Sequence, residues 1–451
     1  MGIIKEIENK RILILGFGRE GESTYDYIRH FLPHKRLSIA DSRNLENDKI
    51  KLDRNLDLYL GENYLDTLKK HDFVFKSPGI SLKEIEISKN CQISSQTDMF
   101  LKYYGNQTIG ITGTKGKSTT TALIFHILKS MNKKALMAGN MGKPLFDIIP
   151  EIDQNSVIVA EFSSHQLEFI QKGPRISVIL NLFQEHLDHY LSYEHYKKAK
   201  LNIALFQDEN DYFISPNYSQ DIEKSPYLKE IKSKFLKFGY DSNLGNYISE
   251  NQLFVKNNLC GIWQEDFPLL GEHNMFNALL ALVVLDILGM DTKEAFGHIK
   301  SFEALSHRLE FVGEYGKIKF YNDSISTIPQ ATLEALKAVK NVDTLILGGF
   351  DRGIEYEDFI KEIIQKDLKN IIFTGEAGIR MMNIAENLKN PDISLIFLVS
   401  YDEIVEYCFL HTKQGKACLL SPAAASYDKF KNFEERGEVF KKLVKKISDK
   451  R

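Results

Sequence analysis

Cysteine and tryptophan are scarce in this chain of 451 residues, which contains four cysteines and one tryptophan. The cysteines, Cys91, Cys260, Cys408 and Cys418, form no C-x-x-C pair and show no metal-type spacing. The sequence therefore gives no sign of a disulfide framework or a zinc cluster. We expect the cysteines to be buried apolar residues of a protein in a reducing compartment.

Long apolar runs and a strong net charge are also absent. The longest apolar run, Ala278–Leu285, is too short to span a bilayer. The first ten residues, MGIIKEIENK, carry charges where a signal peptide has its apolar core. The net charge of −3 provides no attraction for nucleic acid. We expect a cytoplasmic, monomeric protein of roughly two to four domains, with neither a membrane nor a nucleic-acid partner.

The most distinctive segment is TIGITGTKGKSTTT, from Thr108 to Thr121. Its apolar run Thr108–Ile111 predicts a buried strand, and Ala122–Lys129 has helical spacing. Glycines between strand and helix let backbone N–H groups surround phosphate oxygens, and the helix N-terminus adds positive potential. We expect Lys117 to reach the β- and γ-phosphates of a nucleotide and the Ser118 hydroxyl to ligate Mg²⁺.

This loop is shorter than the common pattern G-x-x-x-x-G-K-[ST], whose first glycine would fall at Ile111. The chain has G-x-x-G-K-S instead, with an additional Gly110 upstream. A glycine turn with an exposed lysine is the alternative, but Gly-Lys-Ser at a strand-to-helix turn disfavours it. By itself, the segment indicates a nucleoside triphosphate site.

A second glycine loop, GFGREG, follows the apolar run Arg11–Leu15 near the N-terminus. It opens a helical pattern, Ser23–Phe31, and the next predicted strand, Leu37–Ala40, ends in Asp41. This is the form of a dinucleotide-binding fingerprint with its ribose-binding acid. Alone it predicts an NAD- or FAD-dependent oxidoreductase, although the glycines indicate only a phosphate and not whose phosphate it is.

Apolar runs alternate with helical spacing along the chain, which predicts an α/β protein with mainly parallel sheets. In the middle, Val157–Phe162 and Ile176–Leu180 read as buried strands, and each ends in polar residues. Sites in open α/β sheets lie at such strand ends. The polar stretch from about residue 210 to 260 predicts a small β region or long loops. The later predicted strands are Thr344–Leu347, Asn370–Phe373, Leu395–Val399 and Ala417–Leu420.

We divide the chain into three domains on this basis. The expected domains are a Rossmann-like domain at 1–97, a central P-loop-type ATPase domain at 98–304 and a C-terminal Rossmann-like βα domain at 305–451.

Nine motifs then occur in order: TGTKGKSTT, EFSSHQLE, EHLDHY, YKKAK, GEHNMFNALLA, HRLE, YNDSISTIP, GGFDRG and SPAAASYDKFKNFEERG. Together they resemble the Mur ligases, ATP-dependent amide-bond ligases of peptidoglycan precursor synthesis. The resemblance extends from Gly16 to Gly437. Two features are most similar to the members that add D-glutamate: the short N-terminal fingerprint followed by Asp41-Ser42-Arg43, and the pattern SPAxASxDxFxNFxxRG.

The resemblance implies a ligase that uses ATP and two Mg²⁺ ions to join D-glutamate to UDP-N-acetylmuramoyl-L-alanine through an acyl phosphate. The implied catalytic residues are Lys117, Glu161, His186 and Lys200. The implied metal ligands are Ser118, Glu161, His186 and Lys200, the last as a carbamate. Without the family pattern, Lys200 would be interpreted as a solvated helix lysine.

The resemblance also assigns one group of binding residues to each substrate. For ATP these are Gly113, Thr114, Lys115, Gly116, Lys117, Ser118, Thr119, Asn274, Asn277, Arg308 and Asp323. For the uridine-nucleotide substrate they are Gly16, Phe17, Gly18, Arg19, Gly21, Asp41, Ser42, Arg43, Ser77, Pro78, Gly79, Asn140, Ser163 and Gln166. For D-glutamate they are Thr327, Arg352, Ser426, Tyr427 and Phe433.

The sequence departs from the family pattern at several of these sites. Lys115 stands where Asn or His is usual, and Glu185 replaces an Asp before His186. Ile325 and Ile328 occupy positions that hold Lys and Asn in many relatives, and Arg352 replaces a lysine found in some. Three alternatives stay open: a Mur-type ligase for another amino acid, an NAD- or FAD-binding oxidoreductase, and a non-catalytic regulator that binds a UDP-sugar or ATP.

Overall fold

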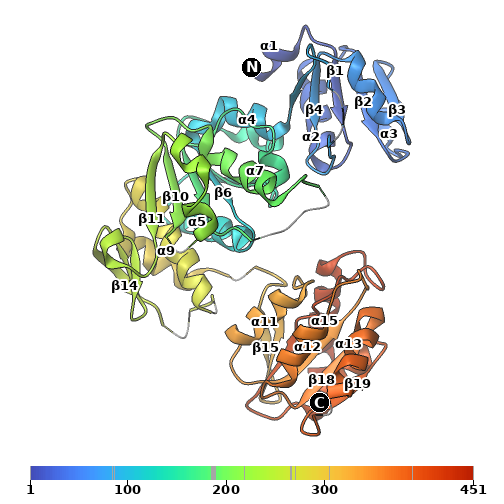
Figure 1. Ribbon diagram of the computed structural model, residues 1–451, viewed down its shortest axis with the longest axis vertical. Coiled ribbons are helices and arrows are strands. Elements are labelled where there is room, and N and C mark those ends of the chain that lie inside the picture. The colour runs from blue at the N-terminus through green and yellow to red at the C-terminus, as the bar shows by residue number, and fades with distance from the viewer. Residues whose placement is uncertain are drawn as a thin grey trace. The chain divides into compact units, whose positions relative to one another are not determined.

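The computed structural model describes residues 2–83, 85, 87–183, 189–217, 219–264, 267–269, 271–303, 305–388 and 390–449. They form two compact units, Met1–Gln264 with Met275–Phe302 and Glu265–Asn274 with Glu303–Arg451. Strands and helices alternate in both units (Figure 1), which confirms the predicted α/β class. No helix within the described ranges is long and apolar enough to cross a membrane.

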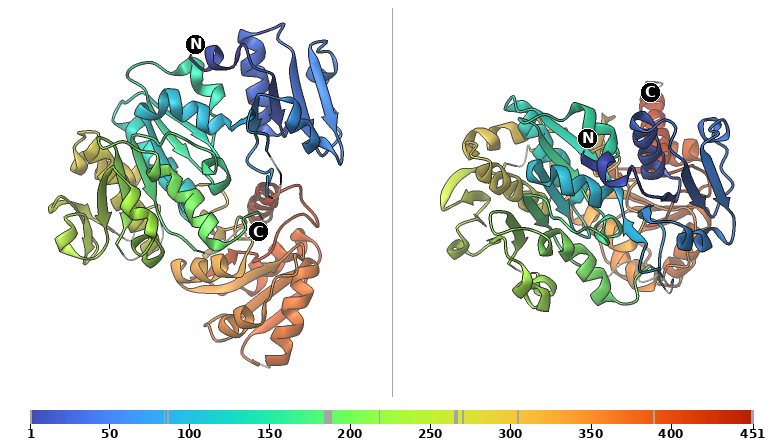
Figure 2. Two further views of the ribbon diagram at one scale, coloured as in Figure 1. Left: turned by 45° about the horizontal axis from the view of Figure 1, so that its top comes forward. Right: turned by 90° about the horizontal axis from the view of Figure 1, so that it is seen from above.

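The N-terminal part of the first unit is a five-stranded parallel sheet of order β3-β2-β1-β4-β5. Its strands are β1 (Ile12–Leu15), β2 (Leu37–Asp41), β3 (Leu56–Leu60), β4 (Phe73–Lys76) and β5 (Gln92–Ser94). Strands β1, β2 and β4 are buried at every position, as expected for a parallel sheet covered on both faces. One face packs against α2 (Arg19–Phe31) and the other against the 3₁₀ helix Tyr64–Lys70. Figure 2 shows this part of the chain, coloured blue, in two further views.

The rest of the first unit is built on a six-stranded parallel sheet of order β11-β10-β9-β6-β8-β7. Its strands are β6 (Thr108–Thr112), β7 (Ala135–Gly139), β8 (Val157–Glu161), β9 (Ile176–Ile179), β10 (Tyr212–Pro216) and β11 (Lys234–Phe238). The main helices here are α4 (Gln96–Tyr104), α5 (Lys117–Ser130), α6 (Ser164–Leu167), α7 (Tyr193–Leu205), α9 (Glu272–Ile287) and α10 (Thr292–Gly297). Short helices α1 (Gly2–Ile7), α3 (Asp48–Lys51) and α8 (Gln220–Glu223) complete the unit.

The polar stretch after residue 210 is more ordered than its composition indicates. It supplies β10 and β11 to the parallel sheet, and β12 (Tyr247–Ser249), β13 (Gln252–Val255) and β14 (Asn258–Ile262) form a separate antiparallel sheet. The small β region is therefore confirmed, but it accounts for only part of this stretch.

Aromatic contacts join the two sheets of the first unit. Phe146, in the 3₁₀ helix Phe146–Glu151, packs against Tyr27 and Phe75, with ring centroids 4.7 and 6.1 Å apart. Beside it, the Ser23 hydroxyl donates to Asp147 over 2.6 Å. This packing brings the loop after β7 next to the glycine loop that precedes α2.

The second unit contains a six-stranded sheet of order β15-β16-β20-β17-β18-β19. Its strands are β15 (Glu310–Tyr315), β16 (Ile318–Asn322), β17 (Val342–Gly348), β18 (Asn370–Thr374), β19 (Ser394–Phe397) and β20 (Ala417–Leu420). One face packs against α11 (Pro329–Ala338), α12 (Glu357–Ile364) and α13 (Gly375–Leu388), and the other against α14 (Tyr401–His411) and α15 (Phe433–Ser448) (Figure 1). The antiparallel edge pair β15–β16 is the one part of this sheet that the sequence did not predict.

Candidate functional site

The phosphate loop connects β6 to α5, as the sequence predicts. Gly116 precedes the first residue of α5 with a φ of 85°, and Gly113 has a φ of 150°. Residues with a side chain rarely adopt these backbone angles, which explains the two glycines. The backbone N–H groups at the start of α5 face the end of the loop, where an anion is favoured.

The side chain of Asn181 holds this loop in place from the segment after β9. Its Oδ1 accepts hydrogen bonds from the backbone N–H groups of Thr114 and Lys115, over 3.0 and 2.8 Å. Its Nδ2 donates to the Lys115 carbonyl over 3.1 Å. The sequence-based assignment missed Asn181, although a polar residue directly after a buried strand was a usable signal.

Two predicted catalytic lysines meet at this loop. Lys117 and Lys200 each donate from Nζ to the Gly113 carbonyl oxygen over 2.9 Å. Lys200 comes from α7 and is 2% exposed, and its ammonium lies 5.1 Å from the ring centroid of Tyr196. The Tyr196 hydroxyl lies 3.1 Å from Oγ1 of Thr114. Lys200 is therefore a buried lysine facing the phosphate loop, not a solvated helix lysine.

Glu161 ends β8, the neighbour of the phosphate-loop strand, and is paired in register with Ile111. Its Oε1 accepts a hydrogen bond from Nδ2 of Asn140 over 2.6 Å. Its Oε2 is shielded from solvent and has no hydrogen-bond partner among the described residues. An orphaned buried carboxylate oxygen next to a phosphate loop fits a hard cation such as Mg²⁺. The predicted ligand His186, and Glu185 before it, lie outside the described residues.

Asn277, on α9, is buried beside the phosphate loop. A Cβ added at Gly116 would lie 3.1 Å from its Oδ1. Asn277, which is predicted to bind ATP, therefore lies next to the loop. The remaining residues of the loop that are predicted to bind ATP, Ser118 and Thr119, are in the first turn of α5.

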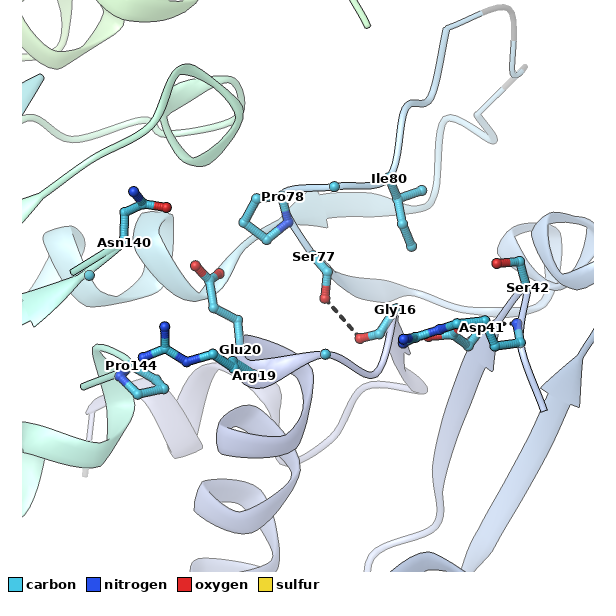
Figure 3. A pocket seen from close by; sticks show the side chains of 14 residues that line it. Gly16, Arg19, Glu20, Asp41, Ser42, Ser77, Pro78, Ile80, Asn140 and Pro144 are labelled. Atoms are coloured by element: carbon cyan, nitrogen blue, oxygen red, sulfur yellow. Dashed lines mark hydrogen bonds and ion pairs between the residues drawn. The ribbon is translucent and has the colours of Figure 1, made fainter. Parts of the chain in front are cut away.

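A pocket of about 470 Å³ lies beyond the carboxyl ends of β1, β2 and β4 (Figure 3). Most of its lining consists of residues assigned above to the uridine-nucleotide substrate: Gly16, Gly18, Arg19, Asp41, Ser42, Arg43, Ser77, Pro78, Gly79 and Asn140. Its other lining residues are Glu20, Ile80, Gly139 and Pro144.

Four predicted residues support this pocket from outside its lining. Phe17 donates its backbone N–H to Asp41 over 2.8 Å, and a Cβ at Gly21 would lie 2.1 Å from the Gly16 carbonyl oxygen. Ser163 and Gln166 form the capping box that begins α6, and Nε2 of Gln166 donates to Oε1 of Glu20 over 2.6 Å.

Asp41 is the charged centre at one end of the pocket. Burial favours its neutral form, but hydrogen bonds from the Arg43 guanidinium and from the backbone of Phe17 and Arg43 outweigh burial and lower the pKa of Asp41 to about 2. Nε and Nη2 of Arg43 each lie 3.0 Å from an Asp41 oxygen. Asp41 is thus an ionised acceptor at the end of β2, where a ribose hydroxyl is bound in nucleotide-binding sheets of this kind.

Asn140 connects the pocket with the second strand end. It lines the pocket, and its side chain donates to Glu161, on the strand paired with β6. Asn140 follows β7 directly, so two neighbouring strand ends carry the two residues. A ligand that fills the pocket as far as Asn140 is therefore close to Glu161.

In the second unit, the buried side chain of Arg436 binds segments that lie next in sequence to residues predicted to bind D-glutamate. Its guanidinium donates to the carbonyl oxygens of Ser324, Ala424 and Ala425, over 2.8, 3.0 and 3.1 Å, and to the Ser324 hydroxyl over 2.9 Å. The Ser324 hydroxyl in turn donates to the Phe433 carbonyl over 2.8 Å. The sequence-based assignment did not include Arg436, which belongs to the FEERG end of its last motif.

These contacts hold together the segments that carry Thr327, Ser426 and Phe433. Ser426 is buried, whereas Tyr427 is 59% exposed. The guanidinium of Arg352 lies 5.4 Å from the ring centroid of Tyr427, within cation–π distance. The guanidinium of Arg352 and the ring of Tyr427 are therefore neighbours, and Tyr427 directly follows the buried Ser426 in the sequence.

Asp323, which is predicted to contact ATP, is enclosed by other residues of the protein. It is 3% exposed and accepts hydrogen bonds from the Ser421 hydroxyl, over 2.7 Å, and from the Leu309 backbone, over 3.2 Å. Burial raises the pKa of its carboxyl to about 6 against these bonds. Of the two remaining predicted ATP residues, Asn274 is buried and Arg308 half-buried.

Protein-family models and known relatives both match this chain. Family models match for the Mur ligase middle domain over residues 111–285 and for the MurD-like N-terminal domain of Mur ligases over residues 10–96. The chain is 35% identical to the UDP-N-acetylmuramoylalanine–D-glutamate ligase of Caldanaerobacter subterraneus subsp. tengcongensis, over 97% of this chain and 99% of the relative. The chain belongs to the Mur ligase family. A relative with the same name from Bacillus cereus (strain AH187) is 33% identical over 99% of this chain and all of its own length.

Solved structures agree at the level of the fold. The chain is similar to Thermotoga maritima UDP-N-acetylmuramate–alanine ligase MurC, with a TM-score of 0.60, 17% identity and coverage of 98% of this chain and 100% of that one. It is also similar to MurF ligase from Thermotoga maritima in complex with ADP, with a TM-score of 0.58, 18% identity and coverage of 98% and 97%. As a Mur ligase, the chain is an ATP-dependent, amide-bond-forming enzyme, so the oxidoreductase interpretation of GFGREG is set aside.

Proposed function

We propose that this enzyme joins D-glutamate to UDP-N-acetylmuramoyl-L-alanine in peptidoglycan precursor synthesis. The reaction is ATP + UDP-N-acetylmuramoyl-L-alanine + D-glutamate → ADP + phosphate + UDP-N-acetylmuramoyl-L-alanyl-D-glutamate. One observation carries the proposal: Asn140 lines the glycine-loop pocket and also binds Glu161, beside the phosphate-loop strand. A uridine nucleotide in the pocket would therefore present its far end to bound ATP.

The first chemical step is phosphoryl transfer to the L-alanine carboxylate. A carboxylate oxygen attacks the γ-phosphorus, the bond between this phosphorus and the β–γ bridging oxygen breaks, and ADP leaves with an acyl phosphate formed. Anions approach one another in this step, so charge neutralisation and positioning dominate catalysis. The cation of Lys117 and the N-terminus of α5 are the groups of this chain suited to that task.

Glu161 and Ser118 are our candidates to hold Mg²⁺ near the nucleotide, with His186 and Lys200 for a second ion. Bound Mg²⁺ supplies neutralisation of phosphate charge. Lys200 would need to react with CO₂: its ammonium would lose one proton, the free amine would form an N–C bond to CO₂, and loss of a second proton from the nitrogen would leave a carbamate anion. Its burial and its position on the carbonyl shared with Lys117 support this, because two ammonium groups at one oxygen repel each other.

The second step forms the amide bond. The amine of D-glutamate attacks the carbonyl carbon of the acyl phosphate, loses a proton, and the tetrahedral intermediate expels phosphate. We assign D-glutamate to Arg352, Thr327, Ser426, Tyr427 and Phe433. A dicarboxylate needs a cation and several donors, and a guanidinium can bind a carboxylate through two hydrogen bonds.

The glycine-loop pocket is our candidate site for the uridine nucleotide. The segment Gly16–Gly21, which contains the N-terminus of α2, would bind the diphosphate. Asp41, Ser42 and Arg43 would meet the ribose and uracil, and Ser77-Pro78-Gly79 would cover the uridine. The domains 1–97, 98–304 and 305–451 would then bind the uridine nucleotide, ATP and D-glutamate, respectively. We further propose a cytoplasmic monomer with small-molecule substrates only.

The test is release of ADP from ATP, Mg²⁺ and UDP-N-acetylmuramoyl-L-alanine, with D-glutamate, L-glutamate, L-lysine or no amino acid added. We expect release that depends on D-glutamate, together with a product heavier by one glutamyl residue in mass spectrometry. Release that depends on L-lysine instead would indicate a Mur ligase for another amino acid. Binding of substrate and ATP with no turnover under any condition would favour a regulator.

A further inference from the structure

Glu20 is a lining residue of the glycine-loop pocket that neither the fingerprint nor the family pattern assigns to a role. It lies in the first turn of α2, and Figure 3 shows its carboxyl group between Arg19 and Pro78. Oε1 accepts one hydrogen bond, from Gln166, over 2.6 Å. Oε2 is shielded from solvent and lacks a hydrogen-bond partner within the described part of the chain. A buried carboxylate with one neutral donor and one orphaned oxygen is poorly stabilised as an anion.

The charged groups around Glu20 do not compensate for this burial. Lys76 faces it from the end of β4, but the ammonium of Lys76 is 3.4 Å from Glu168, which also lies 3.2 Å from His189. Arg19, in the same turn of α2, donates to the Gly142 carbonyl. Arg43, across the pocket, is paired with Asp41.

Burial therefore raises the pKa of Glu20 to about 7, although the hydrogen bond from Gln166 and the charges of Lys76 and Arg19 favour the anion. The free enzyme near neutral pH then holds Glu20 partly as the acid. Burial also lowers the pKa of Lys76, whose charge is favoured by Glu168 and Glu20.

We infer that Glu20 takes up a proton when the diphosphate of the uridine-nucleotide substrate enters this pocket and is a neutral acid in the complex; the inference rests on the function proposed above. The diphosphate of this substrate carries two negative charges. A carboxylate in the lining of the same pocket would repel them, and a neutral carboxyl would not. Glu20 therefore makes the affinity for the substrate depend on pH.

The direction of the pH dependence follows from this. The complex binds more protons than the free enzyme, so affinity falls as the pH rises through about 7. The loss is up to about tenfold per pH unit while Glu20 is ionised in the free enzyme and protonated in the complex. Below about pH 6, affinity no longer depends on this group.

The experiment is calorimetric titration of the full chain with UDP-N-acetylmuramoyl-L-alanine, without ATP, at pH 7.5 in phosphate and in Tris. These buffers differ in ionisation enthalpy, so the difference in measured heat gives the number of protons exchanged. The phosphates of this ligand are diesters and do not titrate near neutral pH. We expect uptake of roughly 0.5–0.8 proton per site, given the pKa of Glu20.

Glu20→Gln mimics the neutral acid and keeps an acceptor for Gln166. We expect it to abolish proton uptake and to make the dissociation constant flat between pH 6 and 8.5. Glu22→Gln is the matched control, since it removes one charge from the same turn of α2, and it should behave like the unchanged protein.

Proton uptake that persists in Glu20→Gln would assign the proton to another group, such as Lys76 or His189, and overturn the inference. Proton release, or no exchange, by the unchanged protein would overturn it without any variant. A failure of the unchanged protein to bind the ligand would contradict the proposed function as well, so the two failures are distinguishable.

Discussion

Lys117 and Lys200 donate to one and the same carbonyl oxygen, that of Gly113, each over 2.9 Å. The first begins α5 and the second lies on α7, so two helices direct their cations to one point of the phosphate loop. Both positions were expected to be catalytic. The shared oxygen indicates that they are interdependent, because a change in the charge of one alters the field at the other.

Replacement of Lys200 tests its proposed carbamate. We expect Lys200→Ala to lower turnover by roughly 100-fold or more, because the proposed anionic ligand is removed. Added acetate or formate should restore part of the activity by occupying the space of the carbamate. Lys198→Ala, on the exposed side of the same helix, is the control and should stay active. Full activity of Lys200→Ala would contradict the assignment.

Replacement of Lys117 separates the two nucleotide sites. We expect Lys117→Ala to reduce ADP release by on the order of 1,000-fold, since a cation at the transferred phosphate is lost. The dissociation constant for UDP-N-acetylmuramoyl-L-alanine, measured by calorimetry, should change by less than about twofold, because Lys117 does not line the glycine-loop pocket. Lys129→Ala, at the exposed end of α5, serves as the control. A parallel loss of substrate binding would argue against separate sites.

Asn181 is expected to shape the ATP site without belonging to the catalytic groups. Asn181→Ala leaves the Lys115 backbone N–H without its acceptor, so we expect the KM for ATP to rise by roughly tenfold and stability to fall by about 1–2 kcal/mol. Asn181→Asp keeps the acceptor and should lose less. Steady-state kinetics and urea unfolding give both quantities. An unchanged KM for ATP in Asn181→Ala would show that the loop keeps its form without this clamp.

Because the pKa of Asp323 is raised in the folded protein, we expect the free energy of unfolding to depend on pH. Its pKa is about 6 in the folded protein, against about 4 in an unfolded chain. The folded state therefore binds more protons than the unfolded state between these values, and the free energy of unfolding falls as pH rises from about 4 to 6. The contribution of this group is about 3 kcal/mol in total. In denaturant unfolding, we expect the free energy of unfolding of the unchanged protein, relative to that of Asp323→Asn, to be lower by this amount above pH 6 than below pH 4. A relative value that does not change with pH would contradict the prediction.

Much of the fold was predictable because the strands that form its centre are buried along their whole length. β1, β2, β4, β6 and β17 read as short apolar runs. The loops after β1, β6 and β17 also contain glycines with positive φ, which few other residues could replace. The edge strands were less visible. In β15 every residue keeps some exposure, and its sequence EFVGEY lacks the continuous apolar run of a buried strand.

The residues of the candidate site were also only partly predictable from the sequence. Gly113, Lys117 and Ser118 are adjacent in sequence, so their chemistry was readable without the fold. Asn181 and Arg436 act through contacts with distant backbone groups, which single residues in a sequence do not reveal. The state of Glu20 depends on what surrounds it, because desolvation is a property of packing and not of the residue type.

The bonds of Arg436 have a consequence for how this enzyme could acquire a new amino-acid preference. Apart from the Ser324 hydroxyl, its partners are main-chain oxygens, which every residue type provides. The hydrogen bonds of Arg436 therefore do not depend on most of the side chains in the segments that it contacts. If Arg352 and Tyr427 bind the amino-acid substrate as proposed, exchanges there would alter selectivity without removing these hydrogen bonds. Loss of the Arg436 guanidinium would instead remove the contacts with Ser324, Ala424 and Ala425 together.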